Sequence, residues 1–182
     1  MNNFMLDIRA LGKAPDSPIF AIECVFFEPS TGKLGPQYYR AVDLRTVEYI
    51  DPEAVLELLK GDAHQRAEVI SATCTELNAV AGLFSFIREN ASLHTELNCW
   101  TVGSARVPQW LIHAARRHDL GHQFVAFKLR CLASLIMLAG VTGYAPHPRR
   151  STATYMLTDA AYQAEQACEI WQRLTSPHLE TL

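Results

Sequence analysis

The stretch IFAIECVFFEPSTGKLGPQYYRAVDL, residues 19–44, decides the fold. Residues 19–27 are rich in β-branched and aromatic side chains, which favour a strand, and Pro29-Ser-Thr-Gly32 predicts a tight turn after it. A second strand is predicted over residues 37–44 and an earlier one over residues 3–8. Three consecutive strands with short connections predict an antiparallel meander at the start of the domain.

The rest of the chain is mainly helical by its pattern. Asp51-Pro52-Glu53 predicts a helix start, because it combines a capping acid with proline at the first helical position. A capping box is predicted at residues 73–76, and a short buried strand over residues 97–102. Helical spacing predicts segments over residues 52–60, 63–70, 77–87, 108–118, 132–139 and 159–174. This order predicts an α/β (α+β) fold with a mixed five-stranded sheet flanked by helices.

Length and composition predict one ordinary globular domain. The chain has 182 residues, of which 49% are hydrophobic and 19% charged, so we expect a single domain over residues 1–176 and a tail over residues 177–182. The net charge of −3 excludes a globally basic nucleic-acid binder but allows a local basic surface. The sequence has neither a long apolar run nor a signal-peptide pattern, so we expect no membrane association and a cytoplasmic location.

The five cysteines are odd in number, widely spread and without a C-x-x-C pair. A disulfide framework or a zinc knuckle would cluster them, so we expect reduced thiols, mostly in the core. Cys131 is predicted to be such a core thiol rather than a nucleophile, because apolar residues follow it. His118 and His122 are separated by Gly121, and we expect histidines of a surface loop there rather than a zinc site.

An ordered set of short motifs resembles a known family. Its pieces are Met5-Leu-Asp7-Ile-Arg9-Ala-Leu-Gly12, Pro18-Ile-Phe-Ala-Ile22, Val25-Phe-Phe-Glu-Pro29, Tyr39-Arg-Ala-Val-Asp43, Ile50-Asp-Pro-Glu53, Trp100-x-x-Gly103 and Leu157-Thr-Asp159 with Ile170-Trp171. The set resembles phage and bacterial exodeoxyribonuclease-VIII-like proteins of the DEDD 3′–5′ exonuclease superfamily. The resemblance covers nearly the whole chain, most clearly residues 2–44 and 154–174, and implies a ribonuclease-H-like fold.

The resemblance also implies a catalytic pattern that this chain departs from. The family needs four carboxylates that hold two divalent cations, and a histidine that serves as general base. Asp7 matches the first acid, but the second falls on Arg9 and the middle-helix acid falls on Val107. The last acid is kept as Asp159, while the histidine position is Thr154. No position of this degenerate site is therefore assigned a catalytic role.

Charge decides how serious these departures are. Four carboxylates give a formal charge of −4, whereas Asp7, Arg9, Val107 and Asp159 give −1. A unit charge pair at about 4 Å is worth about 4 kcal/mol at an effective dielectric constant of 20, so Arg9 beside a divalent ion costs roughly twice that. We therefore expect no metal cofactor, loss of two-metal hydrolysis, and pairing of Arg9 with one or both acids.

Relocated ligands are the alternative. Glu23 lies on the neighbouring strand and could point toward Asp7, and Asp119 and Glu165 are further candidates. An active metal-dependent 3′–5′ exonuclease would then hold Mg²⁺ or Mn²⁺ with Asp7, Asp159 and Glu23. We expect Glu23 instead to be an ordinary polar residue or a second partner of Arg9.

A group of basic residues is the candidate surface for a nucleic acid or an acidic protein partner. It consists of Arg106, Arg116, Arg117, Lys128 and Arg130, with Arg149 and Arg150 in a later loop. The preferred hypothesis is a catalytically inactive, exonuclease-like protein encoded by a phage or prophage. It would act in the bacterial host cell by binding nucleic acid or a host nuclease or defence complex. A homo-oligomer, and a purely structural protein that binds no nucleic acid, remain open as alternatives.

Overall fold

The computed structural model describes residues 1–47, 49–61, 63–92, 96–102, 106–147 and 158–176. Its centre is a five-stranded sheet in the order β3-β2-β1-β4-β5, in which β1, β2 and β3 are antiparallel neighbours and β4 and β5 run parallel to β1. The strands are β1 (Asn3–Ala10), β2 (Ile19–Glu28), β3 (Lys33–Ala41), β4 (Asn98–Thr101) and β5 (Lys128–Cys131). The predicted mixed sheet with an antiparallel meander first is confirmed.

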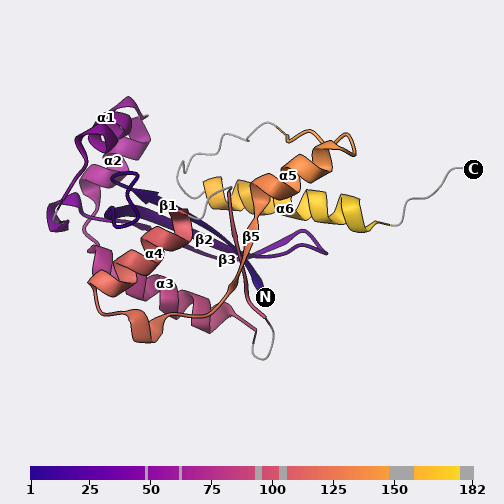
Figure 1. The fold of residues 1–182 in the computed structure, drawn as a ribbon, viewed down its shortest axis with the longest axis horizontal. Coiled ribbons are helices and arrows are strands. Elements are labelled where there is room, and N and C mark those ends of the chain that lie inside the picture. The colour runs from indigo at the N-terminus through magenta and orange to yellow at the C-terminus, as the bar shows by residue number, and fades with distance from the viewer. Residues whose placement is uncertain (48, 62, 93–95, 103–105, 148–157, 177–182) are drawn as a thin grey trace, which may run out of the picture.

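Helices cover both faces of this sheet (Figure 1). Helices α3 and α4 pack on one face, and α5 and α6 pack on the other, while α1 and α2 lie together near one end of the sheet. The helices are α1 (Pro52–Lys60), α2 (Ala63–Ser71), α3 (Glu76–Asn90), α4 (Arg106–Arg117), α5 (Leu132–Gly140) and α6 (Thr158–Thr175). Within the described residues, no helix combines the length and the apolar character needed to cross a membrane.

Alternation along β1 decides which side chains face which layer. Phe4, Leu6 and Ile8 are buried in the cluster beneath α3 and α4, whereas Met5 is buried in the cluster beneath α5 and α6. Because successive side chains of a strand point to opposite faces, Asp7 and Arg9 lie on the same face as Met5. The two residues singled out on this strand therefore face α6.

The antiparallel hairpin extends beyond its predicted bounds. The third strand occupies Lys33–Ala41 rather than residues 37–44, because strand pairing with β2 continues down to the turn. Residues Leu44–Thr46 instead form a 3₁₀ turn, which Asp43 caps by accepting a hydrogen bond from the Arg45 amide. The end of the predicted strand is therefore wrong.

Two further details differ from the sequence expectations. Thr75, rather than Thr73, caps α3 by accepting a hydrogen bond from the Asn78 amide, so the predicted capping box is wrong. Cys131 is exposed at the end of β5, where its sulfur accepts from the Ser134 amide, so its prediction as a core thiol is also wrong. The other four cysteines are buried or half-buried thiols, as expected.

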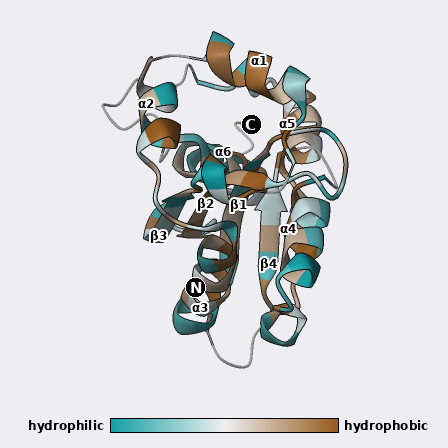
Figure 2. Cartoon of the chain, turned by 90° about the vertical axis from the view of Figure 1, so that its left-hand side faces the viewer, coloured by the Kyte–Doolittle hydropathy of each residue, from teal (hydrophilic) through white to brown (hydrophobic). Residues whose placement is uncertain are grey.

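Helix α1 begins as its sequence predicts. Asp51 accepts a hydrogen bond from the Glu53 amide at 3.0 Å, and Pro52 occupies the first helical position. The helix presents apolar side chains outward, since Leu56 and Leu59 are 49% and 58% exposed. Figure 2 shows the same feature as brown turns of α1, beyond the strand ends and away from α3.

Candidate functional site

Three carboxylates meet where β1 and β2 approach the first turn of α6. They belong to Asp7, Glu23 and Asp159, and one oxygen of each lies within 4.8 Å of the others. Among the described residues, this is the one group of three or more acids, histidines or cysteines that could hold a metal ion. The structure thus brings together the two acids that the family motif retains and a third that the motif does not contain.

Strand register and apolar packing create this arrangement. Asp7 and Glu23 are direct partners in the antiparallel pairing of β1 with β2, so their side chains lie side by side on one face. On the same face, Met5, Val25 and Phe27 pack against the small residues of α6, beginning with Ala160. That packing brings the start of α6, and Asp159 with it, against the two strand carboxylates.

Glu23 is the most unusual member of the cluster. Its residue is only 2% exposed, one carboxylate oxygen accepts from the Ala160 amide at 3.1 Å, and the other finds no hydrogen-bond partner within the described part of the chain. Burial raises the pKa of Glu23 from 4.5 to about 8, against the Ala160 hydrogen bond that lowers it, and repulsion from Asp7 adds to the rise. The expectation of an ordinary polar residue at this position is wrong.

Arg9 lies beside the carboxylates and pairs with one of them. Its guanidinium donates from Nη2 to Oδ2 of Asp159 in an ion pair whose side chains are 20% and 16% exposed. The predicted internal salt bridge at this site is therefore confirmed. The second acid position of the family motif holds a positive charge that is directed into the site.

The remaining motif positions add no ligand among the described residues. Val107 is 6% exposed and packs with Leu111 and Ala114 of α4 in the apolar cluster beneath that helix. Asp119 and Glu165 are exposed and do not join the cluster, so neither is a relocated ligand. Thr154 lies outside the described residues.

A second buried carboxylate ties α4 to the turn between β1 and β2. Glu76 is 4% exposed and accepts from the Ile19 amide at 2.7 Å, from Arg117 at 2.8 and 3.0 Å, and from Nε2 of His118 at 2.8 Å. Burial on its own would raise the pKa of Glu76, but the hydrogen bonds from Arg117, Ile19 and His118 together hold it below its usual range. His118 therefore belongs to a structural network, in contrast to the surface loop expected for it.

The predicted basic surface is only partly available. Arg117 is held by Glu76, and Lys128 forms an ion pair with Glu96. Arg106, Arg116 and Arg130 are exposed, and the first two lie at opposite ends of α4, about 15 Å apart from a rise of 1.5 Å per residue. Arg149 and Arg150 lie outside the described residues. A role of this set in binding stays a prediction.

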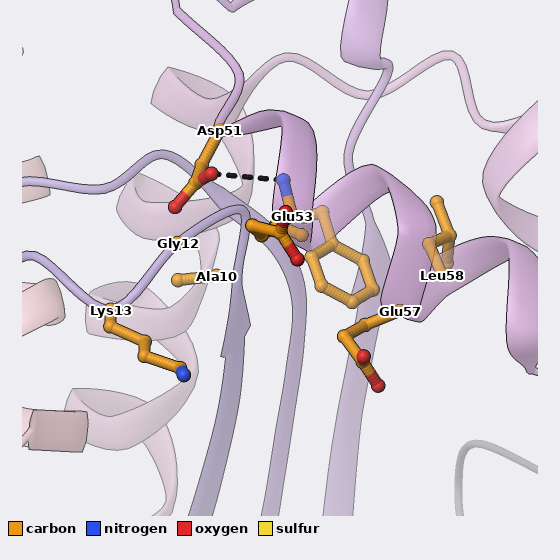
Figure 3. A pocket seen from close by; sticks show the side chains of 9 residues that line it. Ala10, Gly12, Lys13, Asp51, Glu53, Glu57 and Leu58 are labelled. Atoms are coloured by element: carbon orange, nitrogen blue, oxygen red, sulfur yellow. Dashed lines mark hydrogen bonds between the residues drawn. The ribbon is translucent and has the colours of Figure 1, made fainter.

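A cavity adjoins the end of β1, next to Arg9 along the strand. Its volume is about 520 Å³, within the range of small-ligand sites. Figure 3 shows Lys13 reaching toward this space from the turn after β1, and Glu57 reaching toward it from α1. Gly12 permits the close turn there: its φ is +153°, and a Cβ atom would lie 2.6 Å from Oγ of Ser17. The cavity was not expected from the sequence, because it depends on how α1 packs over the strand ends.

The sheet order, the helices on both faces and Asp7 of β1 beside the last helix define a ribonuclease-H-like fold, similar to that of a solved nuclease of the DEDDh family. The sequence profile of the Rv2179c-like 3′–5′ exoribonuclease domain matches residues 2–171. The chain belongs to this family. The narrower resemblance to exodeoxyribonuclease-VIII-like phage proteins stays a prediction.

Solved structures of nucleases share the fold. The nuclease domain of 3′hExo, a DEDDh family member bound to rAMP, is 13% identical with a TM-score of 0.64, over 94% of this chain and 92% of that chain. S. pombe Pop2p in its Mg²⁺- and Mn²⁺-bound form is 12% identical with a TM-score of 0.59, over 97% and 84%. Metal-free E. coli ExoI in complex with single-stranded DNA is 13% identical with a TM-score of 0.63, over 96% and 40%. No curated protein sequence matches the chain.

Proposed function

We propose that this domain binds the 3′ end of a single-stranded nucleic acid and does not hydrolyse it by the two-metal mechanism. Membership of a 3′–5′ exoribonuclease family supports a nucleic acid as the ligand. Two proteins of similar fold have solved structures with bound rAMP and with single-stranded DNA. The observation that carries the proposal is the ion pair between Arg9 and Asp159 inside the carboxylate cluster.

The charge of the site supports the loss of two-metal chemistry. Because burial raises the pKa of Glu23 to about 8, this group is protonated near pH 7, so Asp7, Glu23, Asp159 and Arg9 have a formal charge of −1, which does not balance two divalent ions. A second divalent ion about 4 Å from the guanidinium would meet a repulsion of about 8 kcal/mol at an effective dielectric constant of 20. Val107 supplies no oxygen that could compensate.

Arg9 also suits a binding role. A guanidinium has five N–H donors in a planar fork, so it can hold a carboxylate and a phosphate at the same time. Asp159 fixes its orientation, and the side chain remains 20% exposed, which leaves it within reach of a ligand. The cavity beyond the end of β1, which is lined by Ala10 and not by Arg9, is large enough for a nucleoside.

The direct test uses a 5′-labelled single-stranded RNA of twelve nucleotides, its DNA counterpart and a circular form without ends. Anisotropy in chelator measures binding, and a denaturing gel with Mg²⁺ or Mn²⁺ measures trimming. We expect end-dependent binding, no trimming, and at least tenfold weaker binding by Arg9→Ala. Arg88→Ala, which changes an arginine on α3, is the matched control and should bind as the parent does. Metal-dependent trimming that Asp7→Asn abolishes would overturn the proposal.

The rival function, an active exonuclease with relocated ligands, is favoured by one observation, the closeness of Glu23 to Asp7 and Asp159. The trimming assay separates the two functions. A phage origin, a host nuclease or defence complex as the target, a homo-oligomer and a cytoplasmic location stay predictions. Absence of affinity for all three nucleic acids would refute the proposed function and favour a protein target.

A further inference from the structure

We propose that the outer edge of β5 is a docking site for an extended, acidic segment of a protein partner, which adds a strand to the sheet. β5 is the last strand in the order β3-β2-β1-β4-β5, and among the described residues no strand pairs with its outer side. All four residues of Lys128–Cys131 are exposed. β4 separates this edge from β1, which carries Asp7 and Arg9, so the inference does not depend on the proposed nucleic-acid binding.

The backbone of β5 offers the hydrogen bonds that an added strand needs. Lys128 donates its amide to the Leu97 carbonyl at 2.8 Å, so its backbone groups point toward β4. Because the backbone groups of successive residues in a strand point to opposite edges, the amide and the carbonyl of Leu129 face outward. An extended peptide that pairs with such groups gains affinity from its main chain, and its side chains give specificity.

Lys128 and Arg130 define the charge of the incoming segment. In the parallel pairing with β4, Arg130 is the partner of Trp100, which is buried on the side of α5 and α6, so both cations face that side. Leu129 is the partner of Cys99, which is buried on the side of α3 and α4. A complementary segment therefore has acidic residues opposite the two cations and an apolar residue beside Leu129, which is 49% exposed.

Both cations are available to such a segment. Lys128 pairs with Glu96, but the two side chains are 58% and 51% exposed, and an exposed pair contributes little to stability. An incoming carboxylate can therefore replace Glu96. Arg130 donates from Nη1 to the Leu129 carbonyl at 3.3 Å, and a backbone amide of the added strand would take its place.

The same charges oppose a second copy of the chain as the partner. Two β5 strands that pair antiparallel about a two-fold axis perpendicular to the sheet place residues of the same face opposite each other. In every such register that pairs three residues of each strand, Arg130 then stands opposite Lys128 or Arg130 of the other copy. Like charges directly opposite are destabilising, whereas acids at these positions attract both cations. An acidic partner therefore fits this edge better than a second copy does.

Helix α5, which begins directly after β5, is a second sign that a partner covers this part of the molecule. Ser134 is its only polar residue, yet only two residues of the helix are buried. Met137 and Leu138 are 68% and 57% exposed, and Val141 just after the helix is 86% exposed. A helix that is apolar on all sides is normally covered on all sides, so we expect the partner to contribute apolar surface to α5 as well.

Protection against association is the competing explanation, because proteins often place lysine on a short edge strand to prevent pairing. Leu129→Pro separates the two roles. Proline removes the amide that faces outward, and it is tolerated on an edge strand where that amide takes no part in the sheet. A docking role predicts that the variant loses a binding activity of the parent, whereas a protective role predicts that the parent binds no extended segment.

The experiment measures fluorescence anisotropy of a labelled eight-residue peptide that alternates valine with aspartate, mixed with the full chain at low salt. We expect saturable binding below millimolar concentration, and at least tenfold weaker binding by Leu129→Pro, by Arg130→Glu and for a peptide with asparagine in place of aspartate. Arg40→Glu is the matched control, because it reverses an exposed arginine on β3, the opposite edge strand, and should bind as the parent does.

Two further peptides test the backbone without any change to the protein. One carries N-methyl groups on all valines and the other on all aspartates, so each blocks one edge of the peptide. We expect one of them to lose binding and the other to keep it. If thermal unfolding shows that Leu129→Pro does not fold, this pair carries the test of strand pairing.

Four outcomes would overturn the inference. These are no saturable binding of the acidic peptide, parental affinity in Arg130→Glu, equal binding of the two methylated peptides, and displacement of the peptide by the twelve-nucleotide RNA, which would assign the edge to nucleic acid. Arg9→Ala should bind the peptide as the parent does, and Leu129→Pro should bind the RNA as the parent does. Failure of this proposal is therefore distinguishable from failure of the proposed nucleic-acid binding.

Discussion

Glu23→Gln should remove a pH dependence from the stability of the folded chain. Burial raises the pKa of Glu23 from 4.5 to about 8, so between these values the folded chain keeps a proton that the unfolded chain has released. The contribution of Glu23 to the free energy of unfolding is therefore fully present below pH 4.5, and it is lost as the pH rises toward its raised pKa of about 8. Glutamine has no such proton, so the variant should lack this loss.

The pKa shift sets the size of the effect. A folded state that binds one more proton than the unfolded state loses up to about 1.4 kcal/mol of stability per pH unit. From about pH 6 to about pH 8 the loss amounts to roughly 2 kcal/mol, and the slope flattens as the folded chain begins to release the proton. In the parent, this loss should add to the pH dependence from all other titratable groups, which is the same in the parent and in Glu23→Gln.

Chemical denaturation in chelator at pH 6, 7 and 8 measures the free energy of unfolding for the parent and for Glu23→Gln. The difference between them should change by about 2 kcal/mol across the series, with the parent losing more stability than the variant. Glu165→Gln should follow the parent. Equal pH slopes for the parent and Glu23→Gln would refute the conclusion that the folded chain holds a proton on Glu23.

Arg9→Glu combined with Val107→Asp, in a chain that also carries Thr154→His, restores the acids and the histidine of the family motif, so we expect Mn²⁺-dependent trimming of single-stranded RNA on a denaturing gel. This triple variant should also be less stable, because Val107→Asp places a carboxylate in an apolar cluster. Glu76→Gln should lower the free energy of unfolding by about 2 kcal/mol in chemical denaturation, because the buried carboxylate of Glu76 loses its charge-assisted hydrogen bonds with Arg117. Lys128→Ala breaks an exposed pair and should change it by less than about 0.5 kcal/mol. Arg116→Ala should weaken nucleic-acid binding in anisotropy and reduce its salt dependence, with stability unchanged.

Much of the fold could be predicted because its signals are local. The apolar runs of β1 and β2 fix two adjacent strands, and Asp51 with Pro52 fixes the start of α1. Strand β5 could not be located in this way. Its sequence KLRC is exposed along its whole length, so no alternation of buried and exposed residues marks it, and it is a strand because its backbone pairs with β4.

The candidate site was only partly predictable for a related reason. Asp7, Arg9 and Asp159 follow from sequence spacing and from the family motif, and the structure brings all three together. Glu23 depends on the register between β1 and β2, which the sequence of either strand does not specify. A shift of that register by one residue would turn its side chain to the opposite face of the sheet.

A cation binds oxygens that lie close together in space, whereas a sequence motif specifies acids by their spacing along the chain. On a sheet face, a position on one strand and its partner on the next strand are about 5 Å apart, so either strand can supply a ligand to the same ion. Replacement of an acid on β1 by Arg9 therefore does not by itself empty the site while Glu23 stands opposite Asp7. The motif positions give a formal charge of −1, and the site with Glu23 gives −1 while this carboxyl keeps its proton and −2 once it ionises, because its pKa is raised to about 8. The Mn²⁺ affinity of Arg9→Gln therefore tests the effect of Arg9 directly: a rise in affinity would place the guanidinium against a bound ion, and no change would place any ion elsewhere.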